Sequence, residues 1–88
     1  MYYVYVLKAK KGKQIYIGYT SDLKKRLKEH SEGRTYTTAR FLPVDLVYYE
    51  AYRSMTDAQN REKQLKQHGN ALGHLKRRIA GSLGESAG

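Results

Sequence analysis

Arg26 and His30 are the first pair of residues whose types and spacing suggest chemistry. They stand four positions apart in a stretch with helical periodicity, so both side chains can point the same way. A guanidinium binds phosphate through charge-assisted hydrogen bonds, and an imidazole titrates near neutral pH. The pair therefore predicts a site that binds a phosphate and transfers a proton. The alternative is a cationic helix flank whose terminal histidine complements the helix dipole.

Two tyrosines and a glycine form a second candidate group. Tyr5 lies in the alternating run Tyr3–Leu7, and Tyr16 lies in the run Ile15–Gly18 beyond a lysine-rich turn, which predicts a β-hairpin. If opposite residues have an odd-numbered sum, Tyr5, Tyr16 and Gly18 share one face and the aliphatic residues share the other. Glycine weakens a strand and often marks close approach by a ligand, so Gly18 is a candidate contact for nucleic acid. The alternative is that the tyrosines only pack.

Glu62 is a candidate metal ligand because of its place on a helix. A helix is expected from about residue 54 to residue 67, and on it Glu62 falls between the apolar residues Ala58 and Leu65. An ionised carboxylate beside an apolar stripe costs several kcal/mol unless it is paired or binds a metal. The alternative to a metal is an ion pair with one of three neighbours: Arg61, Lys63 or Lys66.

The polar stretch 32–40 has no strong periodicity and predicts a surface loop. Arg34 and Arg40 could contact a phosphate backbone there, and Tyr36 could stack on a base. Such residues also occur on ordinary polar loops.

The elements that must position these residues predict an α+β fold. A helix over 23–30 follows a capping segment at 20–22, a third strand over 44–50 follows Pro43, and Asn70 caps a last helix that Gly81 stops. We therefore expect a three-stranded antiparallel sheet flanked by about three helices. The single domain should span residues 1–81, with 82–88 as a flexible tail.

Composition favours a nucleic-acid partner. The 88 residues include 17 Lys and Arg against 8 Asp and Glu, a formal net charge of +9. Such an excess concentrates polyanions, and the basic residues are not gathered on a helix with a large apolar face, so a membrane surface is disfavoured. The absence of cysteine excludes disulfides, thiolate metal sites and a cysteine nucleophile. The N-terminus does not look like a signal peptide, and a cytoplasmic monomer is expected.

Taken together, these motifs resemble the GIY-YIG nuclease superfamily. The similarity is to its small single-domain bacterial members, which are like the N-terminal incision domain of the nucleotide-excision-repair nuclease, and it runs from about Tyr2 to Ile79. It rests on five signals in order: Tyr3-Val4-Tyr5, Tyr16-Ile17-Gly18, the following segment 18–23, the pair Arg26 and His30, and Arg61-Glu62-Lys63-Gln64-Leu65.

The resemblance implies phosphodiester hydrolysis supported by one divalent cation, Mg²⁺ or Mn²⁺. It implies that Tyr5 is the general base on water and Tyr16 the second motif tyrosine, with Arg26 on the phosphate, His30 as the helix histidine and Glu62 as the metal ligand. A free phenol titrates near ~10, and nearby cations are expected to favour the phenolate.

The chain also departs from the family pattern. Tyr3 replaces the first glycine of the motif, the tryptophan that many small relatives carry is missing, and Asn70 is no secure match for the late asparagine.

We therefore predict a metal-dependent endonuclease that acts on nucleic acid, with DNA favoured over RNA and a role in DNA repair. One alternative is a catalytically idle nucleic-acid-binding module. Another is a small protein-interaction or ribosome-associated domain.

Overall fold

The sheet is three-stranded and antiparallel, as expected. A computed structural model describes residues 1–67 and 69–84, apart from the side chains of residues 36 and 37. Strand β1 (Tyr2–Ala9) lies in the middle, with β2 (Ile15–Thr20) on one side and β3 (Val44–Tyr52) on the other. Both pairings are antiparallel, which confirms the α+β class predicted from the sequence.

The register of the hairpin sorts its side chains into two sets. Tyr5 lies opposite Gly18, and Leu7 lies opposite Tyr16, so the opposed residues have odd sums as expected. Because side chains alternate along a strand, the tyrosines and Gly18 share one face of the sheet. Val4, Val6 and Ile17 share the other face, with Val6 opposite Ile17, whereas Leu7 lies on the face of the tyrosines.

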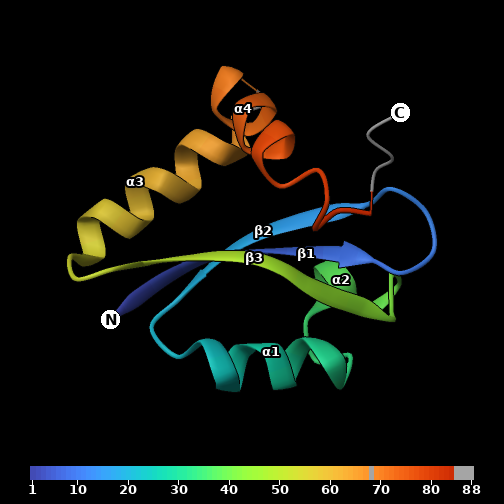
Figure 1. Ribbon diagram of the computed structural model, residues 1–88. Coiled ribbons are helices and arrows are strands. Elements are labelled where there is room, and N and C mark those ends of the chain that lie inside the picture. Colours follow the sequence, from blue (N-terminus) through green and yellow to red (C-terminus); the bar gives the residue numbers. More distant parts are fainter. Residues whose placement is uncertain (68, 85–88) are drawn as a thin grey trace.

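Helices cover both faces of the sheet (Figure 1). Helices α3 (Met55–Lys66) and α4 (Asn70–Arg78) lie on one face, and α1 (Leu23–Ser31) and the one-turn α2 (Tyr36–Ala39) lie on the other. The central strand is therefore enclosed, and residues 4–7 are all buried. Within the described residues, no helix is long and apolar enough to cross a membrane.

The aliphatic face forms the hydrophobic core with α3 and α4. Val4, Val6 and Ile17 pack there against three residues of the helices: Ala58, Leu65 and Leu75. Each of the valine, leucine and isoleucine side chains contributes about 1.5–3 kcal/mol when it is removed from water. The core thus fixes α3 against β1 and β2.

Local capping explains where two helices begin. The Asp22 carboxylate accepts a hydrogen bond of 3.1 Å from the Lys25 amide at the start of α1, and the Ser54 hydroxyl accepts one of 3.2 Å from the Asp57 amide at the start of α3. These side chains satisfy amides that the helix leaves without partners. Asn70 is the first residue of α4 and not its cap, because Gly69 occupies the cap position.

The segment expected as a surface loop contains α2. The Thr35 carbonyl accepts hydrogen bonds from the amides of Thr38 and Ala39, which closes one helical turn. Thr38 is buried at 1% exposure beneath this turn. The prediction of a loop was wrong here because one turn is too short to show periodicity in the sequence.

Two other boundaries differ from expectation. Strand β3 extends to Tyr52 because its end pairs with Tyr2. Leu83 is buried, so the packed chain continues beyond residue 81. The rest of the predicted tail, 85–88, lies outside the described residues.

Candidate active site

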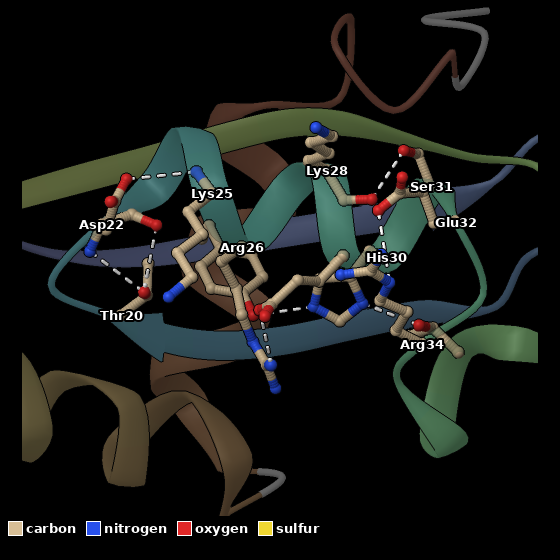
Figure 2. A network of polar contacts seen from close by, with 12 residues as sticks. Thr20, Asp22, Lys25, Arg26, Lys28, His30, Ser31, Glu32 and Arg34 are labelled. Atoms are coloured by element: carbon tan, nitrogen blue, oxygen red, sulfur yellow. Dashed lines mark hydrogen bonds and ion pairs between the residues drawn. The ribbon is translucent and has the colours of Figure 1, made fainter.

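A hydrogen bond between Tyr5 and His30 joins the central strand to α1. The Tyr5 Oη and His30 Nε2 atoms lie 2.9 Å apart, and both side chains are almost fully buried. Figure 2 shows His30 and Arg26 side by side on α1. The spacing of four residues thus does place both groups on the side of the helix that faces the tyrosines.

Thr38 supports the second nitrogen of His30. Its Oγ1 atom lies 2.7 Å from His30 Nδ1. Burial lowers the pKa of His30, and the charge of Arg26 lowers it further, so the ring is neutral at pH 7. A neutral imidazole carries one N–H, so His30 donates to one of the two hydroxyls and accepts from the other. In the tautomer with Nε2–H, Thr38 donates to Nδ1 and Tyr5 accepts, which is the arrangement that a Tyr5 phenolate requires.

Sequence reasoning missed Thr38. A threonine in a polar stretch carries no distinctive signal, and its role depends on α2 folding back onto α1.

Gly18 makes room for the Tyr5 ring. A Cβ atom at this position would stand 2.3 Å from Tyr5 Cζ and 2.4 Å from Tyr5 Oη. No residue with a side chain fits there unless the tyrosine moves. The close approach that the glycine predicted is therefore filled by Tyr5. A contact between Gly18 and nucleic acid stays a prediction.

Tyr16 completes an aromatic group around the hydrogen bond. Its ring centroid lies 6.3 Å from that of Tyr5 and 5.3 Å from that of His30. The Lys66 ammonium lies 6.0 Å from the Tyr16 centroid. The ring thus separates the buried Tyr5–His30 pair from a cation on α3.

The protonation of Tyr5 differs from the expectation of a phenolate. Burial raises the pKa of Tyr5 to about 12, while a hydrogen bond with Arg26 pulls it down and the neighbouring Tyr16 and Glu62 push it up. Arg26 also forms an ion pair of 3.2 Å with Glu29, so its guanidinium interacts with both Glu29 and Tyr5. Arg26 acts in the expected direction, but desolvation outweighs it.

Glu62 reaches the same region from α3. Its carboxylate pairs with Lys66 at 3.1 Å, so one of the predicted ion pairs is present. Helix α3 contacts both β1 and β2, and Glu62 is close enough to Tyr5 to influence its pKa. The structure thus brings together Tyr5, Tyr16, Arg26, His30 and Glu62.

The predicted loop contacts lie outside this group. Arg34 is exposed and pairs with Glu32 at 3.4 Å. The Arg40 guanidinium lies 5.2 Å from the centroid of the Phe41 ring. The Tyr36 side chain is outside the described part of the structure. Contacts of Arg34, Tyr36 and Arg40 with nucleic acid stay predictions.

Comparison with known proteins identifies the family. The profile of the GIY-YIG catalytic domain matches residues 1–78. The chain is 46% identical over 67 residues to the UPF0213 protein of Streptococcus agalactiae serotype V, with 74% of each chain covered. It is 44% identical over 68 residues to the UPF0213 protein of Clostridium perfringens, covering 75% of this chain and 71% of the relative.

A solved structure gives the same result. The solution NMR structure of the UPF0213 protein of Bacillus halodurans matches with a TM-score of 0.54 and 33% sequence identity, over 90% of this chain and 85% of that one. The fold, the ordered motifs and these relatives lead to one assignment: this chain belongs to the GIY-YIG family.

Proposed function

We propose that this protein is a metal-dependent endonuclease that hydrolyses phosphodiester bonds of nucleic acid, with DNA preferred over RNA. The observation that carries the proposal is the Tyr5–His30 hydrogen bond of 2.9 Å, around which Arg26, Tyr16 and Glu62 converge. Structural packing alone would not require an arginine, an imidazole and a carboxylate around one buried phenol. A repair role, a cytoplasmic location and a monomeric state stay predictions from the sequence.

Tyr5 is suited to act as the general base once it is ionised. His30 Nε2–H and the Arg26 guanidinium would both donate to its oxygen and stabilise the phenolate. The phenolate takes a proton from water, the resulting hydroxide attacks phosphorus, and the leaving oxygen takes a proton from solvent water as its bond to phosphorus breaks. Arg26 is also placed to hold a phosphoryl oxygen as negative charge grows there.

Glu62 fits a divalent cation that is held by few protein groups. No cluster of three or more candidate ligands occurs among residues 1–67 and 69–84, so Glu62 would hold the cation while water and substrate fill the other positions. That arrangement is common for Mg²⁺, but the Glu62 carboxylate must first break its ion pair with Lys66. A bound Mg²⁺ or Mn²⁺ would neutralise charge on the phosphate.

Access to Tyr5 requires movement of the side chains around it. The ring is fully buried, whereas the Arg26 and Lys66 side chains are 36% and 50% exposed. Both are long cations with a partner carboxylate, and an arriving phosphate would compete for them. We propose that substrate draws these two side chains outward and exposes Tyr5 Oη.

A nicking assay tests the proposal. Purified protein is incubated with duplex, single-stranded and branched substrates, with Mg²⁺, Mn²⁺ or EDTA. We expect cleavage only with a cation, and a loss of at least ~10²-fold in both Tyr5→Phe and Glu62→Ala. Because the pKa of Tyr5 is about 12, the rate should rise with pH through the neutral range as the phenolate fraction grows. Full activity in both folded variants would exclude this site.

A catalytically idle nucleic-acid-binding module is the second candidate. It is favoured by the complete burial of Tyr5 and by the Lys66 bond that engages Glu62. It predicts salt-sensitive binding without cleavage under any cation. Cleavage that disappears in Glu62→Ala would exclude it.

A further inference from the structure

A cavity at the tip of the hairpin is lined, among the described residues, by three lysines and no carboxylate. Its volume is about 520 Å³, and it lies between the turn joining β1 to β2, the end of α4 and the segment 79–84. Lys8, Lys13 and Lys76 contribute to its lining from three separate parts of the chain. No carboxylate lines this cavity within the described residues.

The cavities around α1 differ in this respect. Two of them, of about 400 and 390 Å³, include Asp22, and a third of about 400 Å³ includes Asp45 beside Lys28. Each thus contains its own negative group. Asp45 also pairs with Lys10 at 3.6 Å, at the other side of the hairpin turn. Of these four cavities, the one at the tip of the hairpin has the largest volume and has no carboxylate among its described lining residues.

Backbone carbonyls hold one of the three ammonium groups in place. Lys8 Nζ donates to the carbonyls of Ala9 at 3.3 Å and Gly12 at 3.1 Å. Carbonyl oxygens orient an ammonium group without cancelling its charge, unlike a carboxylate. Lys8 lies opposite Ile15, which places it on the sheet face that α3 and α4 cover.

The segment after α4 forms a stable wall of the cavity. The segment 79–84 returns from α4 to the sheet (Figure 1). The Leu83 amide donates to the Ile79 carbonyl at 2.9 Å, and the Leu83 side chain is 4% exposed. The cavity is thus lined by the buried Leu83 on one side and by lysine side chains on the other.

We propose that this cavity is a phosphate-binding site that holds the backbone of nucleic acid away from the reaction surface. The identity of the polyanion rests on the proposed function, since a compact polyphosphate offers the same chemistry. Tyr5 faces α1, whereas this cavity lies on the face of α4. A nucleic acid that contacts both the cavity and the surface around Tyr5 must pass around the hairpin. Its path over the protein would then be fixed relative to the candidate active site.

The test compares two charge-matched double variants. Lys13→Gln with Lys76→Gln removes two exposed cations of the cavity and spares Lys8, which bonds the turn. Lys24→Gln with Lys28→Gln removes two exposed cations of α1 and serves as the control. Binding of a fluorescent DNA oligonucleotide is measured in EDTA at several salt concentrations, so cleavage does not enter.

The cavity variant should bind on the order of tenfold more weakly than the control, and its slope of log K against log[salt] should be shallower by about 1.8, two phosphate contacts at ~0.9 each. The Gly12 and Gly84 amide resonances should shift with the oligonucleotide. Equal binding by the two variants would overturn the proposal. Glycine amides that do not shift with the oligonucleotide would also overturn it, including when the same amides do shift with tripolyphosphate. Binding through the cavity without any cleavage would support it and reject only the nuclease.

Discussion

At the scale of single residues, the position of Tyr5 depends on a neighbour without a side chain. Gly18→Ala would place a methyl group 2.3 Å from Tyr5 Cζ, so the ring must leave its contact with His30. We expect destabilisation of about 1–3 kcal/mol from overpacking, together with loss of cleavage. Urea unfolding and the nicking assay measure the two effects.

Gly73→Ala is the matched control for that substitution. Nothing lies within 4 Å of the added atom at this helical position, so alanine should stabilise the protein by about 0.5–1 kcal/mol. If Gly18→Ala behaved like Gly73→Ala, the packing of Tyr5 against Gly18 would not be the constraint inferred from the structure.

The residues found from sequence share a local signal. Tyr5 and Gly18 follow from alternation within one hairpin, and Arg26 and His30 follow from a spacing of four on one helix. Thr38 could not be found this way, because its contact with His30 exists only after α2 packs against α1. Nor does spacing reveal that burial, and not the nearby cations, sets the pKa of Tyr5.

At the scale of elements, a partly buried ion pair clamps α3 to β3. Arg61 donates to both carboxylate oxygens of Glu50 through contacts of 3.0–3.1 Å, and the Tyr48 and Tyr52 hydroxyls donate to the same group. Burial opposes ionisation of Glu50, but the hydrogen bonds from Arg61 and the two tyrosines outweigh it and lower its pKa. Arg61 precedes Glu62, so this clamp fixes how α3 presents the candidate metal ligand.

Glu50→Gln tests the clamp. It removes the charge that Arg61 faces and leaves buried donors with one acceptor fewer, so we expect a loss of about 2 kcal/mol in the free energy of unfolding. Asp45→Asn is the control, because its pair with Lys10 is more than half exposed and should change stability by less than ~0.5 kcal/mol. Similar losses in chemical unfolding of the two variants would argue against a clamp.

The sequence could not specify this clamp. Arg61 was one of three neighbours expected to pair with Glu62, yet the partner of Glu62 is Lys66. Arg61 turns instead toward Glu50, eleven residues earlier, on a strand whose position relative to α3 is decided by long-range packing. By contrast, the helix itself and its Ser54 cap were readable from local pattern.

At the scale of the whole molecule, a net charge of +9 on 88 residues opposes compaction. Self-repulsion is screened by salt, so raising KCl from roughly 20 to 200 mM should increase stability by up to about 1 kcal/mol. Thermal unfolding at pH 7 measures this as a rise of several degrees, at about 4–8 °C per kcal/mol for a domain of this size. A melting temperature that falls with KCl would show that local ion pairs dominate over net charge.

The overall architecture was largely predictable, for a physical reason. A hairpin, a third strand and three longer helices each bury one face with its own period, so their existence and the α+β class follow from pattern. The position of β3 beside β1 does not follow, because that pairing joins residues 35 to 50 positions apart along the sequence. The burial of Leu83 likewise does not follow from local pattern, because it depends on the segment 79–84 returning from α4 to the sheet.

The order of the site along the chain has a consequence for synthesis. Tyr5, Tyr16, Arg26 and His30 leave the ribosome first, but β1 keeps an open edge until β3 has followed, and Glu62 comes later still. In the mechanism proposed above, a partly synthesised or truncated chain would therefore carry the candidate phosphate-binding groups without the candidate metal ligand. Such a chain is expected to bind nucleic acid without cleaving it, so that proposed activity would require the completion of α3.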